Sequence, residues 1–172
     1  LSSKPFEVPK SLLARLHGVA PITMAVAGVD SPEMIESART AFHAHVIRPR
    51  LIGKPERILE LAQKAKWSVD GFRVIDADGD EDISRTAVSL VRAGQAQAIM
   101  KGDIRTQTQL RAVLDEDAGL RTQHRISHLF HMTVPGDKRV LYITDAAVNV
   151  APDAASLCEI IVNAVGMVNK LG

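Results

Sequence analysis

A short group of polar residues follows one apolar run and could bind an anion. The run Ala98–Met100 is typical of the end of a buried strand, and Gly102 interrupts it. Lys101 and Arg105 are cationic, and a helix is expected to begin near Thr106. Free N–H groups at a helix N-terminus and a forked guanidinium both suit phosphate oxygens. The segment therefore predicts a phosphate-binding loop, unless it is only a polar surface turn with Thr106 as an ordinary helix cap.

Arg111 lies within the helix that should follow this loop. Asp115 comes four residues later, so an exposed ion pair of about 0.3 kcal/mol is one explanation of Arg111. A functional Arg111 would point toward the strand ends instead. Arg121 and Arg125 add local positive charge, and each alone is better explained as a surface residue.

Three histidines occur close together, at His124, His128 and His131. They would share one face of a helix, but their segment is apolar and typical of a strand, in which side chains alternate. Ser127 and His131 would then lie opposite His128. We therefore expect no metal site here.

Asp145 and Asn149 follow a later strand and precede the last helix. Asp145 could contact a charged ligand, or it could equally cap the turn, since Asp and Asn favour such positions. The single cysteine, Cys158, has no partner that would make it a nucleophile, so packing is its expected role. The sequence has neither a Walker motif nor a G-x-G-x-x-G motif after its first strand.

Strands and helices alternate along the first two thirds of the chain, which is typical of a mostly parallel α/β sheet. After Gly119 the pattern changes to a hairpin, so the sheet is expected to become mixed there. Strands are expected at 22–27, 46–53, 72–76, 96–100, 125–135 and 139–145, and helices at 10–18, 30–45, 54–66, 80–94, 106–117 and 152–172. Pro49 suggests an edge strand or a bulge, and Gly172 would be a C-cap.

The composition narrows the class of protein. Of 172 residues, 46% are hydrophobic and 3% aromatic, and the net charge is +1. A sizeable core is expected. With so few aromatic residues and almost no net charge, we expect neither a surface on which bases stack nor an overall positive potential that attracts nucleic acid. No apolar run approaches the roughly 20 residues of a membrane span, and no signal peptide is visible. One cysteine fits a reducing compartment, so we expect a cytoplasmic protein without nucleic-acid or membrane partners.

Three segments in register resemble one family. The segments "MKGDIRTQTQLRAVLDEDAGLRT", "RISHLFHM" and "LYITDAAVNVAPD", with a later "NAV", resemble the phosphate acetyl/butyryl transferase family. The resemblance implies a three-layer α/β/α fold of two lobes, similar to the isocitrate dehydrogenase type. Its division would be 1–20 as a leader and short helix, 21–122 as a first lobe and 123–172 as the start of a second.

The resemblance also implies a reaction and its site. A short acyl group moves between coenzyme A and phosphate by direct attack in a ternary complex, with coenzyme A as substrate and no covalently bound cofactor. Arg111 and Ser127 match positions expected to be catalytic. The expected substrate- or phosphate-binding positions are Gly102, Arg105, Thr106, Asp145 and Asn149. A homo-oligomer is implied as well.

Family members are much longer, and the chain begins with Leu1, so it is expected to be a piece of a longer protein that is inactive alone. The part expected to be missing would carry a serine–arginine pair and an acidic base. One alternative is a non-catalytic phosphate- or CoA-binding module of the same fold. Another is a related enzyme of that fold that uses a nicotinamide or a phosphorylated substrate.

Overall fold

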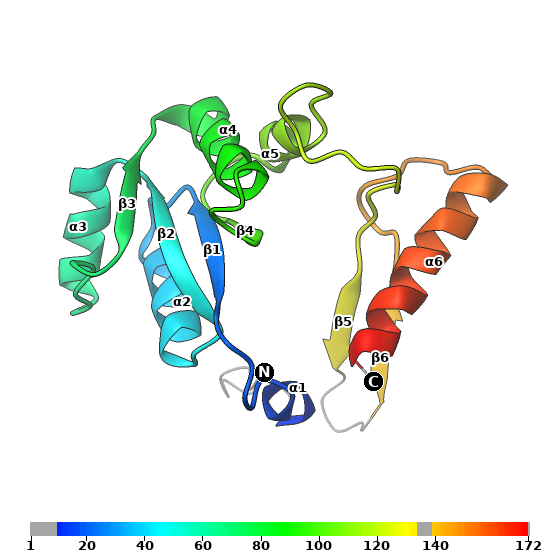
Figure 1. Cartoon of the computed structure of the whole chain (residues 1–172), viewed down its shortest axis with the longest axis horizontal. Coiled ribbons are helices and arrows are strands. Elements are labelled where there is room, and N and C mark those ends of the chain that lie inside the picture. Colours follow the sequence, from blue (N-terminus) through cyan, green and yellow to red (C-terminus); the bar gives the residue numbers. More distant parts are fainter. Residues whose placement is uncertain (1–9, 134–138, 172) are drawn as a thin grey trace, which may run out of the picture. The chain divides into compact units, whose positions relative to one another are not determined.

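The chain divides into two compact units. The computed structural model describes residues 10–133 and 139–171, and one unit is Gly18–Arg121 (Figure 1). The other unit combines Leu1–His17 with Thr122–Gly172, within the same described residues. The expected leader before Lys10, the hairpin turn at 134–138 and the expected cap Gly172 lie outside the described residues.

The unit Gly18–Arg121 contains one parallel sheet in the order β3-β2-β1-β4. Its register pairs Ile22 with Ile47 and Met24 with Ala98, so all strands run in the same direction. The strands are β1 (Ile22–Ala27), β2 (Ile47–Gly53), β3 (Arg73–Asp76) and β4 (Ala98–Lys101). The helices are α2 (Pro32–His43), α3 (Pro55–Lys64), α4 (Gly79–Arg92) and α5 (Thr106–Val113).

Alternating side chains of the central strands form two cores, one on each face of the sheet. Val26 and Leu51 pack with α2 and α3 on one face, whereas Ala25 and Ile52 pack with α4 on the other. All four side chains are fully buried. This unit therefore has three layers, as expected for parallel strands that are apolar on both faces.

Helix α2 begins where local chemistry predicts. Ser31 is the N-cap, its Oγ accepts a hydrogen bond of 3.3 Å from the N–H of Met34, and Pro32 occupies the first turn. A capping hydroxyl and a proline with preset φ both favour this start. The first turn of α2 is thereby fixed beside the end of β1.

Several boundaries and the place of one strand differ from the sequence prediction. Pro49 suggested an edge strand or a bulge, but β2 is an interior strand. Its pairing with β3 begins only at Arg50, so no hydrogen bond to β3 is lost because Pro49 lacks an N–H. Helix α5 ends at Val113 rather than Asp117, because the Asp115 carboxylate accepts backbone N–H bonds and forms a turn. The strand expected from Arg125 begins only at Phe130.

The other unit contains α1 (Lys10–Ala14), β5 (Phe130–Thr133), β6 (Val140–Ile143) and α6 (Ala154–Leu171). β5 and β6 pair antiparallel and form a two-stranded sheet of their own instead of extending the parallel sheet. Within the described residues, α6 is one helix that is long and apolar enough, by length and composition alone, to cross a membrane. The sequence prediction had found no such run. Asn163, Glu159 and Lys170 interrupt its apolar surface.

Candidate functional site

The carboxyl ends of the four parallel strands meet at one edge of the sheet. Sheets of this kind bind ligands at that edge, between two neighbouring strands at which the order of the strands reverses. In this sheet these two strands are β1 and β4. A crevice of about 380 Å³ lies there. It is lined by Gly28, Val29, Asp30, Gly53, Lys54, Arg57, Ala77, Asp78, Gly79, Asp80, Ile83 and Asp103.

Gly102 brings two loops into direct contact at this edge. Its N–H donates to the carbonyl of Ala27 at 2.8 Å, and the N–H of Asp103 donates to that of Gly28 at 2.9 Å. A Cβ atom at Gly102 would overlap the carbonyl oxygen of Gly28 and lie 3.0 Å from that of Ala27. The space that glycine leaves is thus filled by the β1 loop.

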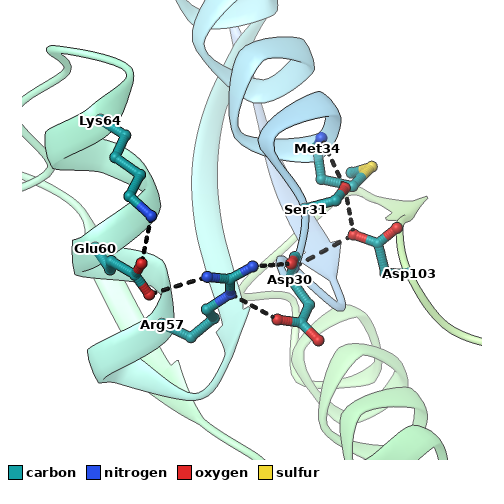
Figure 2. Close-up of polar contacts among 7 residues, drawn as sticks. All are labelled: Asp30, Ser31, Met34, Arg57, Glu60, Lys64 and Asp103. Carbon is teal, nitrogen blue, oxygen red and sulfur yellow. Dashed lines mark hydrogen bonds and ion pairs between the residues drawn. The ribbon is translucent and has the colours of Figure 1, made fainter.

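Asp103 ties the β4–α5 loop to the start of α2 (Figure 2). Its Oδ2 accepts hydrogen bonds from Ser31 Oγ at 2.7 Å and from the N–H of Asp30 at 3.3 Å. Arg57 approaches Asp30 from α3, with Nε 3.0 Å from Oδ1 of Asp30 and Nη1 2.9 Å from Oε2 of Glu60. The loops after β1 and β4 and the first turn of α3 are therefore connected by charged and polar contacts.

This network of Asp30, Ser31, Arg57 and Asp103 is not predicted from the sequence. A signal for part of it was present, because Asp30–Ser31 follows β1 and Asp103 follows β4, and neighbouring parallel strands end at the same edge. Arg57 had no such signal, since its contact depends on how α3 packs.

Arg105 and Lys101 already bind groups of the protein. Nε of Arg105 lies 2.5 Å from Oδ2 of Asp80, which also accepts the Arg105 N–H at 3.1 Å. These contacts lower the pKa of the Asp80 carboxyl below its usual value. Lys101 Nζ donates to the carbonyls of Gly102 and Ile104 at 3.0 and 2.7 Å. Both cations thus stabilise the loop.

The start of α5 has no side-chain cap. Arg105 is the N-cap residue and Thr106 is the first helical residue, so Thr106 does not cap the helix. Its exposed hydroxyl has no hydrogen-bond partner in the part of the chain that the structure describes. Thr106 is therefore open to solvent next to a helix N-terminus.

Arg111 lies in a different place from Arg105 and does not line the crevice at the strand ends, toward which a functional Arg111 was expected to point. It lines a groove of about 240 Å³ between α4 and α5, together with Arg85, Glu81 and Asp115. Asp115 does not pair with Arg111, because its Oδ1 accepts the N–H groups of Asp117 and Ala118 at 3.0 and 2.8 Å. Within residues 10–133 and 139–171, the Arg111 guanidinium has no hydrogen bond or ion pair. It remains available to an anion.

Ser127, Asp145 and Asn149 lie together in the other unit. Asn149 Nδ2 donates to the carbonyl of Ile126 at 3.0 Å and also to Oδ2 of Asp145. Asp145 Oδ1 accepts the N–H of His128 at 3.3 Å. The loop that follows β6 thus holds the residues on either side of Ser127.

The carboxylate of Asp145 is surrounded by donors. The N–H groups of Ala147, Val148 and Asn149 donate to it at 3.3, 3.1 and 3.1 Å. Burial alone would raise the pKa of Asp145, but hydrogen bonds from the Asn149 side chain and these backbone groups outweigh it and lower the pKa to about 2. Asp145 is therefore an ionised carboxylate that organises the turn.

The histidines of the 124–131 segment do not gather around a common point. His128 packs edge-on to Phe130 at 4.0 Å between ring centroids, and His131 packs against Tyr142 across the hairpin. No three His, Cys, Asp or Glu side chains are placed to hold a metal ion within the described ranges.

The predicted site residues form three groups. Gly102, Arg105 and Thr106 lie at the end of β4 and the start of α5, and Arg111 lies on the α4–α5 groove. Ser127, Asp145 and Asn149 form the third group. The unit Gly18–Arg121, with a doubly wound parallel sheet and polar loops at its strand ends, belongs to the class of α/β folds in which small ligands bind at such loops.

Comparison with known proteins identifies the family. The family model "Phosphate acetyl/butaryl transferase" matches residues 80–172, and the chain belongs to that family. The chain is 34% identical to phosphate acetyltransferase of Rickettsia typhi over 161 residues, 94% of this chain and 46% of that protein. It is 33% identical to phosphate butyryltransferase of Clostridium beijerinckii over 170 residues, 99% of this chain and 55% of that protein.

Solved structures show the same fold. A branched-chain phosphotransacylase from Enterococcus faecalis superposes with a TM-score of 0.70 at 28% identity, covering 88% of this chain and 52% of that one. A phosphotransacetylase from Streptococcus pyogenes gives a TM-score of 0.75 at 19% identity, covering 91% and 57%. The chain spans about half the length of the curated relatives it matches.

Proposed function

We propose that this chain is part of a phosphate acyltransferase that moves a short acyl group between coenzyme A and phosphate. The observation that carries the proposal is Arg111. In the segment 101–111, Lys101 and Arg105 bind groups of the protein, whereas the Arg111 guanidinium has no partner among the described residues. The relatives named above are phosphate acetyl- and butyryltransferases.

In this reaction coenzyme A is the nucleophile, so the protein has to supply hydrogen-bond donors and not a nucleophile of its own. The thiolate of coenzyme A attacks the carbonyl carbon of the acyl phosphate, so a carbon–sulfur bond forms and the carbon–oxygen bond to phosphate breaks. Negative charge shifts onto the carbonyl and phosphate oxygens. Arg111 donates to the phosphate oxygens, and Ser127 donates its hydroxyl hydrogen to an oxygen that gains charge. Cys158 is exposed on α6, so the packing role expected from the sequence is wrong, and Cys158 has no role in this scheme.

The other predicted site residues support Arg111 and Ser127. Gly102 and Arg105 hold the loop before α5, Thr106 offers its hydroxyl to phosphate at the helix N-terminus, and Asp145 and Asn149 hold the Ser127 segment. We also propose the division 1–20, 21–122 and 123–172, a cytoplasmic location and a homo-oligomer, with coenzyme A as substrate. Many exposed apolar side chains on α6, such as Val162, support a further interface there.

The proposal is tested by a thiol-release assay on the whole gene product. Acetyl, propionyl and butyryl phosphate are each supplied with coenzyme A, and acyl-CoA formation is followed against blanks without enzyme. Turnover of at least one acyl phosphate is expected, and none would overturn the proposal. The 172-residue chain assayed alone is expected to show little or no turnover.

A second candidate is a module that binds phosphate or coenzyme A without catalysis. The groove that Arg85 and Arg111 line together with Glu81 and Asp115 lies wholly within one unit, and Arg111 has no partner among the described residues, so an anion held there by Arg111 needs nothing from the other unit. Calorimetry with inorganic phosphate and with coenzyme A separates the two functions, because a module binds in the absence of any turnover.

A further inference from the structure

Asn163 stands out within α6 as a polar side chain that binds a distant segment. Its Nδ2 donates to Ser127 Oγ at 3.0 Å and to the carbonyl of Arg125 at 2.8 Å. Asparagine is unfavourable in a helix interior, and most of its neighbours in α6 are apolar. The two contacts give Asn163 a specific task in joining α6 to the Ser127 segment.

The orientation of the Asn163 amide follows from its partners. A backbone carbonyl can only accept a hydrogen bond, so the atom that faces the Arg125 carbonyl must be the nitrogen of the amide. The same nitrogen faces Ser127 Oγ. The serine oxygen is therefore the acceptor in that bond, and its own hydrogen is left over.

The hydroxyl hydrogen of Ser127 has no acceptor among the described residues. The main chain beside it is fixed by other contacts, because Asn149 donates to the carbonyl of Ile126 and Asp145 accepts from the N–H of His128. Thr144 Oγ1 donates to the carbonyl of His128 at 2.5 Å. Because the Ser127 oxygen accepts from Asn163, its own hydrogen is left for a partner other than Asn163.

We propose that Asn163 is a positioning residue that makes Ser127 a directed hydrogen-bond donor to an oxygen of the acyl phosphate. This inference rests on the proposed function. Asn163 does not touch the substrate in this scheme, and its effect passes entirely through the Ser127 hydroxyl. A donor that is already oriented needs no rearrangement as negative charge develops, which is why its loss should lower kcat more than it raises KM.

The test is the variant Asn163→Asp in the whole gene product. A carboxylate of the same shape accepts the Ser127 hydrogen and so removes it from the substrate. We expect kcat for acyl phosphate to fall on the order of 100-fold, with KM for coenzyme A unchanged. Asn169→Asp is the matched control, because Asn169 is exposed on the same helix and has no hydrogen bond within the described residues. It should retain wild-type kinetics.

A double-mutant cycle with Ser127→Ala separates positioning from a general loss of structure. If Asn163 acts through Ser127, Asn163→Asp lowers kcat little further in the Ser127→Ala background. Additive losses, or unchanged kcat in Asn163→Asp, would overturn the inference while the proposed function stands. A wild-type protein without turnover would instead overturn the proposed function and the inference together.

A second substitution covers the case in which Asn163→Asp does not fold, as judged by circular dichroism. Asn163→His keeps an N–H donor near the position of the amide nitrogen. It should retain at least ten times the kcat of Asn163→Ala, which has no donor. Equal kcat in these two variants would also overturn the inference.

Discussion

The apolar side chains of the two units have opposite surroundings. In Gly18–Arg121, Val26 and Leu51 are 0% exposed, whereas Leu141 on β6 is 48% and Val162 on α6 is 69% exposed. The first unit completes its core with its own residues, so hydrophobic burial stabilises it. The second is held largely by the polar contacts of Asp145, Asn149 and Asn163. The comparison teaches that the two units rest on different forces.

The largest expected effect tests the core of the parallel unit. Leu51→Ala should lower the free energy of unfolding by about 2–5 kcal/mol, because it leaves a cavity among fully buried side chains. Leu59→Ala is the matched control, since Leu59 is exposed on α3, and its change should stay within about 0.5 kcal/mol. Urea unfolding followed by the fluorescence of Trp67, the single tryptophan, reports on this unit. Equal effects of the two variants would contradict the comparison.

The next effect concerns the two arginines of the parallel unit. Arg111→Ala should lower kcat/KM for acyl phosphate by about 100-fold in the whole gene product, because it removes a donor to the phosphate oxygens. Arg105→Ala should change it less than about fivefold, since Arg105 is paired with Asp80. Steady-state kinetics with varied acyl phosphate measure both. If Arg105→Ala has the larger effect, the phosphate site lies at the strand ends.

A third prediction tests the polar support of the second unit. The pKa of Asp145 is about 2 in the folded protein and 3.8 as its ordinary value, so the ionised form stabilises folding. That contribution is complete above about pH 4 and is lost as the pH falls toward about 2. Asp145→Asn should remove this pH dependence and lower the stability at pH 7 by about 1–3 kcal/mol.

Fluorescence of Tyr142, the single tyrosine, follows this unit during an acid titration. Asp117→Asn is the control, because the Asp117 side chain has no hydrogen bond among the described residues. If Asp145→Asn unfolds in acid at the same pH as the wild-type protein, groups other than Asp145 control the acid response.

The smallest effect belongs to the ion pair between Arg105 and Asp80. The Arg105 side chain is 78% exposed, so Arg105→Ala should lower the melting temperature only slightly. That loss should shrink as sodium chloride is raised, because salt screens exposed charges. Thermal melting at low and high salt measures it. A larger, salt-independent loss would show that Arg105 supports the loop by packing.

Much of the parallel unit could be predicted from the sequence. Buried strands such as Ile22–Ala27, and helix starts such as Ser31–Pro32, carry local signals in hydrophobicity and capping. The site was harder, because pairing is decided by distant residues. Nothing near Arg105 in the sequence indicates that Asp80 is its partner. Asp115 was the expected partner of Arg111, but in the structure its carboxylate accepts backbone N–H groups of the turn after α5.

The second unit shows the same limit more strongly. The helix of α6 was predicted from its apolar pattern, and the "NAV" segment was noticed only through the resemblance. That Asn163 donates to Ser127 depends on how α6 packs against a segment 36 residues earlier in the chain, which no local pattern encodes.

The contact between Gly102 and the β1 loop has a consequence for how the loop meets a ligand. The amides of Gly102 and Asp103 are bonded to Ala27 and Gly28 where no side chain fits, so they should exchange with solvent as slowly as strand amides. A loop with such protection is already ordered before binding. A ligand that contacts it loses little affinity to ordering the chain, and binding should leave its exchange rates nearly unchanged.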